Sequence, residues 1–267
     1  VTATTAEFKL ELDLDRDLYV GCDASLDAVN RGYRGGDPAW SYPNSRVEGA
    51  HGNASHGGRG KGYSTSNPEY DSLFDPRDSG AGSPIAPGGG VIRIAAQGSL
   101  SIDGLASAAA GAAGGSIRLQ GQRVGGLGRV HAEGNNGSSG GRIALLGGVI
   151  ADDFVDRAWA PGVGSYHSGT AGTIYVRRGS QRYGDLIIDN GDNQYFEELE
   201  ATELLPIGTG VITAASESSI VDAAADFRHG LDGARVTFGG DDAHDFIDAS
   251  ARQCADLVAA AGAEGMR

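Results

Sequence analysis

The stretch Gly114-Gly115-Ser116-Ile117-Arg118-Leu119 decides the fold, because related copies of it recur along the chain. The other copies are Gly89-Gly90-Val91-Ile92-Arg93-Ile94, Gly140-Gly141-Arg142-Ile143-Ala144-Leu145 and Ala171-Gly172-Thr173-Ile174-Tyr175-Val176. Their central isoleucines, at positions 92, 117, 143 and 174, are separated by 25, 26 and 31 residues. A nearly fixed spacing in this range indicates stacked repeat units. It is also about the length of one coil of a parallel β-helix.

Each copy predicts a short strand with one apolar face. Ile117 and Leu119 are two residues apart and point to the same side of such a strand, whereas Arg118 points to the other side. A strand this short cannot bury its apolar face alone, so each copy must stack on the next. The glycines before the strand allow either a positive φ or a close approach to the coil below. Further strands at 99–102, 128–132 and 185–188 predict two or three strands per coil.

These patterns predict an all-β fold, a right-handed parallel β-helix solenoid. Residues 7–18 alternate between apolar and charged side chains and predict a half-buried strand. Residues 37–87 lack any periodic pattern and predict a long lateral insertion, the kind of segment that often carries binding in repeat proteins. Residues 245–263 place apolar side chains at helical intervals and predict a C-terminal helical cap over the open end.

We therefore expect two parts, which are residues 1–190 with the insertion 37–87, and residues 191–267 with short strands and the terminal helix. The 45 glycines and 7% aromatic residues disfavour a helical bundle. A net charge of −14 argues against nucleic acid as a partner, and no apolar run is long enough to span a membrane. Cys22 and Cys254 either form a disulfide or remain free. The start at Val1 favours a piece of a longer protein.

The order of motifs resembles that of large bacterial extracellular and surface proteins with glycine-rich parallel β-helix repeats. The resemblance lies in Gly32-Tyr33-Arg34-Gly35-Gly36, in His56-Gly57-Gly58-Arg59-Gly60, in the repeated Gly-Gly-x-Ile strands and in the closing segments 172–176 and 183–191. It covers about residues 18–191. The resemblance implies an adhesive, fibrous or envelope component, and it implies no catalytic residues.

Two acidic clusters are candidates for metal binding, and calcium is the cofactor that they would suit, because calcium prefers oxygen ligands. The first cluster is Asp13, Asp15 and Asp17, and the second is Asp152, Asp153 and Asp156. An acidic surface facing solvent is the alternative explanation for the first cluster. The EF-hand pattern is incomplete, because Leu18 and Ala24 stand where a calcium loop beginning at Asp13 needs glycine and glutamate.

A second set of residues is a candidate for glycan binding. Aromatic side chains in the insertion could stack on sugar rings or could instead pin the insertion to the coils; they are Trp40, Tyr42, Tyr63 and Tyr70. Outward-facing arginines would form a ladder at about 4.8 Å spacing, which could bind an acidic glycan or pair with nearby acids. The ladder consists of Arg93, Arg118 and Arg142.

The sequence contains no nucleophile elbow, zinc-protease motif or phosphate loop, so it gives no support for catalysis. It predicts a secreted, non-catalytic structural or adhesive segment of a larger protein, located outside the cell or on its surface. Its expected partners are polysaccharide, or neighbouring copies or domains of the same surface assembly. A polysaccharide-binding or polysaccharide-cleaving module is the first alternative, and a viral fibre or decoration subunit is the second.

Overall fold

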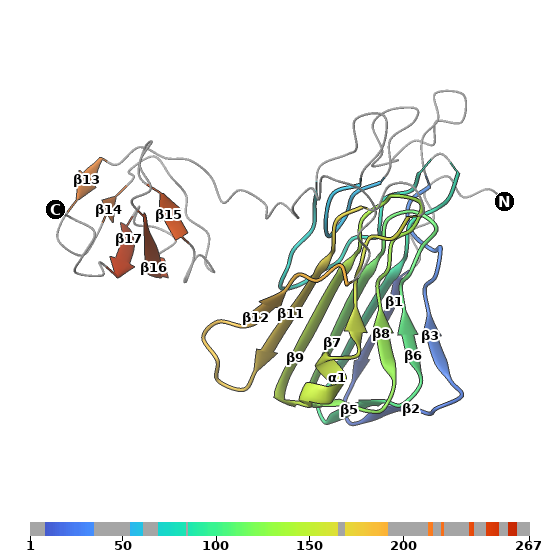
Figure 1. Cartoon of the computed structure of the whole chain (residues 1–267). Helices are drawn as coiled ribbons and strands as arrows, with labels where there is room; N and C mark the ends of the chain where they lie inside the picture. The colour runs from blue at the N-terminus through green and yellow to red at the C-terminus, as the bar shows by residue number, and fades with distance from the viewer. Residues whose placement is uncertain are drawn as a thin grey trace. The chain divides into compact units, whose positions relative to one another are not determined.

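A computed structural model describes ten parts of the chain. They are residues 9–34, 54–60, 69–83, 85–164, 169–191, 213–215, 220–221, 235–237, 244–250 and 256–260. The chain divides into two compact units, Val1–Leu205 and Pro206–Arg267 (Figure 1). Each unit is described by itself below.

The first unit contains a large sheet in which neighbouring strands are mostly parallel. Its main order is β1-β4-β7-β9-β11-β12, and β2 and β5 belong to the same sheet. The strands are β1 (Lys9–Leu14), β2 (Leu18–Val20), β4 (Val91–Ala96), β5 (Ser99–Ile102), β7 (Ser116–Gly125), β9 (Arg142–Ile150), β11 (Thr173–Arg178) and β12 (Asp185–Ile187). The half-buried strand expected within 7–18 is confirmed as β1, in which the leucines are partly buried and the charged residues exposed.

A second, smaller sheet of the first unit is wholly parallel, in the order β10-β8-β6-β3. Its strands are β3 (Ser25–Asp27), β6 (Leu105–Ser107), β8 (Arg129–His131) and β10 (Ala158–Trp159). One helical turn, α1 (Asp152–Val155), lies between β9 and β10. Its buried Phe154 joins the same hydrophobic core as the strands.

The repeated strands lie in register. Ile92 pairs with Ile117, Ile117 with Ile143, and Ile143 with Ile174. All four side chains are buried in one hydrophobic cluster. Because each strand places the same residue type at the same depth, branched aliphatic side chains form continuous columns that keep water out of the space between the sheets. The predicted register of the four copies is therefore confirmed.

The glycine pairs are required by close backbone approach. A Cβ on Gly115 would overlap the carbonyl oxygen of Gly90, and a Cβ on Gly141 would overlap that of Gly115. The glycines with positive φ are others, such as Gly126 and Gly179. Of the two reasons anticipated from the sequence for these glycine pairs, a close approach to the backbone of the neighbouring repeat is confirmed.

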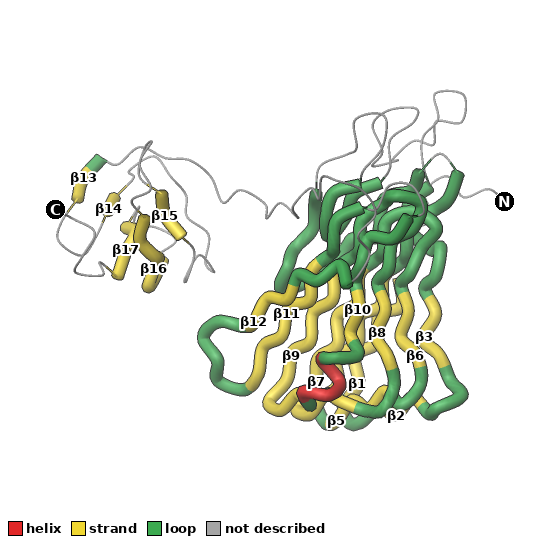
Figure 2. Tube along the Cα trace, in the orientation of Figure 1, coloured by secondary structure: helices red, strands yellow, loops and turns green. Residues whose placement is uncertain are grey.

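Glycine-rich segments outside the strands form a layer of their own at one end of the first unit, among the loops drawn in green in Figure 2. They hydrogen-bond to one another through the backbone: Gly80 donates its N–H to Gly89, Gly89 to Ala113, and Gly57 to Gly140. This layer includes the described parts of the insertion, 54–60 and 69–83. The insertion is thus joined to the repeats through main-chain hydrogen bonds.

The predicted fold class, an all-β parallel β-helix solenoid with a helical cap, is wrong. The described residues form mixed parallel and antiparallel sheets with few helices, an α/β-like arrangement in its sheets of parallel strands. β12, expected as a further coil strand at 185–188, instead runs antiparallel to β11. Only residues 179–184 separate the two strands. That length permits a hairpin, whereas a parallel crossover needs a dozen or more residues.

The second unit is an antiparallel sheet in the order β13-β14-β17-β16-β15. Its strands are β13 (Ala214–Ala215), β14 (Ile220–Val221), β15 (Arg235–Thr237), β16 (His244–Ser250) and β17 (Asp256–Ala260). The terminal helix predicted at 245–263 is wrong, because β16 and β17 occupy that region. Periodicity cannot separate helix from strand in short apolar runs, and the aspartates and serine of this segment are weak helix formers.

Candidate functional site

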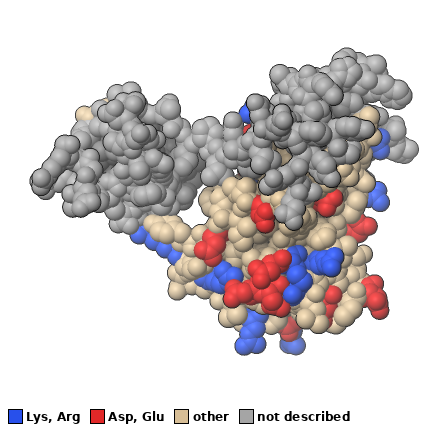
Figure 3. Space-filling model, in the orientation of Figure 1, with Lys and Arg blue, Asp and Glu red and all other residues tan. Residues whose placement is uncertain are grey.

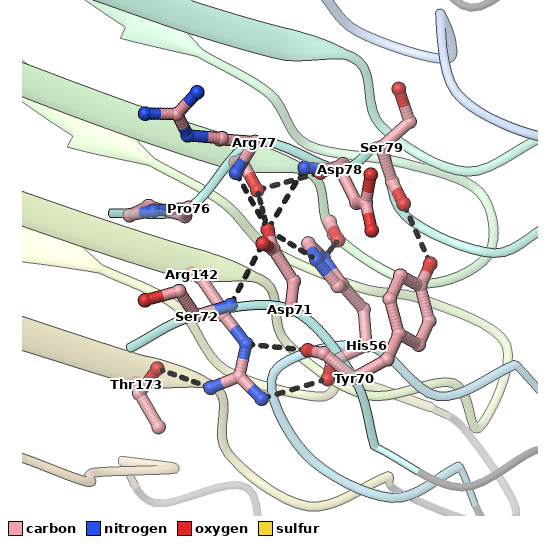
Figure 4. Close-up of polar contacts among 12 residues, drawn as sticks. His56, Tyr70, Asp71, Ser72, Pro76, Arg77, Asp78, Ser79, Arg142 and Thr173 are labelled. Carbon is pink, nitrogen blue, oxygen red and sulfur yellow. Dashed lines mark hydrogen bonds and ion pairs between the residues drawn. The ribbon is translucent and has the colours of Figure 1, made fainter. Parts of the chain in front are cut away.

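The fold brings a group of polar side chains together beneath the insertion, and Figure 4 shows their contacts. His56 and Asp71 come from the insertion, whereas Arg142 and Thr173 begin β9 and β11. The side chains of His56 and Arg142 are almost fully buried, with 0% and 1% of their surface exposed. We call these four residues together with Tyr70 the buried polar cluster.

Asp71 is the acidic centre of this cluster. Its φ is 70°, a conformation that aspartate tolerates better than most residues. Its carboxylate accepts backbone N–H bonds from Ser72, Arg77 and Asp78, at 2.7, 2.8 and 2.9 Å. Burial raises the pKa of Asp71, but hydrogen bonding and charge from His56, with backbone N–H donors, lower it to about 2. The carboxylate therefore stays ionised and holds the 71–78 loop closed around it.

His56 connects the insertion to the repeats. Its Nδ1 lies 2.7 Å from the carbonyl oxygen of Gly114, so this nitrogen must carry a proton. Its Nε2 lies 3.6 Å from Oδ2 of Asp71. The ring therefore lies between a main-chain carbonyl of the repeat strands and the carboxylate of the insertion. The ring also packs against Tyr70, with 4.7 Å between ring centroids.

Arg142 joins three segments of the chain. Its guanidinium donates to the backbone carbonyl of Tyr70 at 2.8 Å, to Oγ1 of Thr173 at 3.0 Å and to the carbonyl of His56 at 3.4 Å. Burial lowers the pKa of Arg142 to about 10, with the charge of Asp71 acting in the opposite direction. The side chain thus remains a cation at neutral pH, and it donates charge-assisted hydrogen bonds to two carbonyl groups of the insertion.

A second polar contact layer lies between the insertion and the outer face of the large sheet. Arg93 and Arg118 are paired in register on β4 and β7, and both reach Asp75 of the insertion at 2.8 Å. Burial raises the pKa of Asp75, but hydrogen bonds from Arg77 and Arg93 and the nearby positive charges lower it. Phe74 adds an edge-to-face contact with Tyr175, at 4.8 Å between centroids.

The residues predicted to bind glycan are thus placed as follows. Arg93 and Arg118 do form a column, because they pair in register. Arg142 instead pairs in register with Ser116, so it lies two residues away from that column. All three arginines contact the insertion. The hydroxyl of Tyr70 donates to the carbonyl of Ser79 at 2.6 Å, which makes it a packing residue here. Trp40, Tyr42 and Tyr63 lie outside the described residues.

The residues predicted to bind calcium are dispersed. Asp13 lies in β1, whereas Asp15 and Asp17 follow its end. Asp17 accepts the backbone N–H of Ser99. Asp152 and Asp153 pair with Arg178 and Arg157, respectively, and Asp156 is exposed. Within the part of the chain that the structure describes, no three His, Cys, Asp or Glu side chains converge as a metal-binding group.

The buried polar cluster was missed by sequence reasoning, which singled out Arg142 and Tyr70 only as glycan-binding residues. The usable signal was His56 in His-Gly-Gly-Arg-Gly, a histidine between segments that have to pack closely. Nothing in the sequence around Asp71 distinguishes it from other aspartates. Because the cluster is buried and its groups contact one another, it can cross-link the insertion to β9 and β11.

Comparison with known proteins finds no matching family model, no matching curated protein and no matching solved structure. The resemblance to bacterial surface proteins remains a prediction. Among the described residues, no helix combines the length and apolar character needed to cross a membrane. Cys22 is exposed. Cys254 lies outside the described residues, so the disulfide between them is untested and stays a prediction.

Proposed function

We propose that this chain is a non-catalytic structural and adhesive segment of a larger extracellular or cell-surface protein. The observation that carries the proposal is what the side chains of the buried polar cluster contact. Its histidine, aspartate and arginine are the kinds of groups that perform chemistry in enzymes. Here they are engaged with the backbone and with one another, at positions that solvent hardly reaches.

The construction of the first unit supports a mechanical role. Parallel strands in register bury an aliphatic column, and the antiparallel β12 covers the outer edge of β11. The insertion is fastened by backbone hydrogen bonds, ion pairs and a buried guanidinium, so that surface loops are held to the repeat strands at many points.

The surface chemistry is compatible with exposure to an aqueous exterior. The chain carries 35 acidic and only 21 basic residues, and Figure 3 shows both kinds side by side on one face of the first unit. Such a surface keeps a protein soluble and disfavours binding to anionic polymers. The two cysteines give no indication of a disulfide scaffold.

The absence of catalysis can be tested with the purified full chain. We would incubate it with neutral and acidic polysaccharides, peptides and ester substrates and measure products by chromatography, expecting no turnover. The variant Asp71→Asn is the decisive control. Turnover that disappears in this variant while the protein remains folded would show that the cluster is catalytic and would overturn the proposal.

The location can be tested by labelling cells of the source organism with antibodies raised against the first unit. We expect labelling of intact cells or recovery of the protein from the medium. Labelling that appears only after the cells are permeabilised would contradict an extracellular role.

A further inference from the structure

A polar groove crosses the outer face of the large sheet, away from the strand positions that the insertion covers. Its volume is about 1250 Å³. The insertion contacts the first halves of β4, β7, β9 and β11, through strand residues that include Arg93, Ser116, Arg142 and Tyr175. The groove begins where these contacts end, at the second halves of the same strands, and it extends to β1.

Two of the residues that line the groove are glycines on adjacent strands. Gly121 and Gly147 pair in register on β7 and β9, and Gln122 donates its backbone N–H to Gly98 at 2.7 Å. A Cβ on Gly121 would lie 3.0 Å from the carbonyl oxygen of Gly98, and one on Gly147 would lie 2.9 Å from that of Gly121. Neither position can carry a side chain without crowding the neighbouring backbone, so both contribute only main-chain atoms to the lining.

The groove is long enough for an extended polymer. One row of paired residues crosses it, running Asp13, Ala95, Gln120, Leu146 and Arg177 from β1 to β11. With about 4.8 Å between neighbouring strands, the four steps span about 19 Å. The β-ladder already uses the backbone hydrogen-bonding groups of these strands. A ligand must therefore be recognised through side chains, which disfavours an added peptide strand.

The side chains that project into the groove are chemically suited to hydroxyl groups. Gln97 and Gln122 are exposed, and each amide both donates and accepts hydrogen bonds, as a sugar hydroxyl does. Two aspartates, Asp13 and Asp15, balance the charge of two arginines, Arg123 and Arg177. Val149, 61% exposed, supplies an apolar contact. A formally neutral lining of this kind favours an uncharged ligand.

We propose that this groove binds an extended neutral polysaccharide. The site differs from the aromatic and arginine residues suggested by the sequence, because those that are described hold the insertion in place. The inference names a binding partner for the adhesive segment proposed above. It rests on that proposed function only for its biological meaning. The binding itself can be measured independently.

The test is affinity electrophoresis of the full chain in gels containing soluble neutral glucans, mannans, galactans or xylans, with polygalacturonate as the acidic comparison. We expect at least one neutral polymer to retard the folded protein. The double variant Gln97→Ala/Gln122→Ala should weaken that binding at least tenfold at an unchanged melting temperature. Arg123→Ala should also weaken it, whereas Arg129→Ala, an exposed arginine on β8 outside the groove, should not.

Three outcomes would overturn the groove proposal: no retardation by any neutral polymer, stronger retardation by polygalacturonate, or equal binding by the wild type and the double glutamine variant. Cleavage of the bound polymer would instead overturn the non-catalytic function and leave the groove assignment in place. Failure of the two proposals is therefore distinguishable.

Discussion

The two faces of the repeated strands are stabilised in different ways. Inward, each strand contributes the same kind of aliphatic residue to a shared column, as Ile92, Ile117 and Ile143 do. Outward, the same strands meet the insertion through specific polar contacts, such as those of Arg142 with its three acceptors. The inner face is specified by repetition and the outer face by individual polar contacts.

This difference predicts different consequences of mutation. A change that separates two neighbouring repeat strands affects both faces of the sheet, because the sheets and the glycine-rich layer share the same backbone spacing. A change on the outer face should loosen the insertion while the aliphatic columns remain packed. The two kinds of stabilisation can be separated by measuring global unfolding together with the protease sensitivity of the insertion.

The largest effect is expected for Gly115→Ala. The new methyl group would overlap the carbonyl oxygen of Gly90, a backbone atom that cannot move without separating the paired strands β4 and β7. We expect a loss of about 3 kcal/mol in the free energy of unfolding, measured by chemical denaturation. Gly21→Ala is the matched control, since its Cβ would come no closer than 3.7 Å to a neighbouring heavy atom. Equal stability of the two variants would contradict the close-approach explanation of the repeat.

The next largest effect is expected for Arg142→Met, which retains much of the aliphatic volume and removes the buried guanidinium. The carbonyl groups of Tyr70 and His56 lose a donor, and the charge of Asp71 loses a nearby cation. We expect a loss of about 2 to 3 kcal/mol and faster proteolysis within the insertion. Arg129→Met, at an exposed position, should leave both measurements unchanged. An Arg142→Met protein with wild-type protease resistance would show that the outer face does not depend on this contact.

The same contrast explains what the sequence could predict. The register of the strands followed from the repeat, because the pattern itself encodes which residues lie above one another. The direction of β12 did not follow from its composition, and depends on the short connection after Arg178. The strands β16 and β17 were mistaken for a helix, because a short apolar segment takes its conformation from the partners with which it pairs.

The buried polar cluster was hidden for a related reason. His56 and Arg142 are 86 residues apart, and neither belongs to a spaced motif that would connect them. Their proximity results from the insertion folding back over strands whose stacking is already set. The groove could not be predicted from the sequence for the same reason, since Gln97 and Gln122 line one groove only when the repeat strands pair.

Acid should weaken the outer face before it affects the aliphatic columns. The pKa of Asp71 is lowered from 3.8 to about 2 in the folded protein. Its ionised form therefore contributes about 2 kcal/mol of stability above pH 4. That contribution is lost as the pH falls from about 4 to 2, because the unfolded chain takes up the proton first.

Unfolding measured across this pH range should show a shallower pH dependence in Asp71→Asn than in the wild type. Asp156→Asn, which alters an exposed aspartate of the first unit, provides the control and should retain the wild-type dependence. Identical slopes for the wild type and Asp71→Asn would assign the acid sensitivity to other groups.

The smallest effect is expected for Phe74→Ala, which tests the apolar part of the outer face. Phe74 is 48% exposed and meets Tyr175 edge to face, so its removal should cost about 1 kcal/mol. Ile85→Ala is the control, because that side chain is 79% exposed and its truncation should change stability by less than about 0.5 kcal/mol. If Phe74→Ala instead destabilised the protein as strongly as Arg142→Met, the outer face would depend on apolar packing as the inner face does. The two faces would then differ only in whether their residues repeat along the sequence.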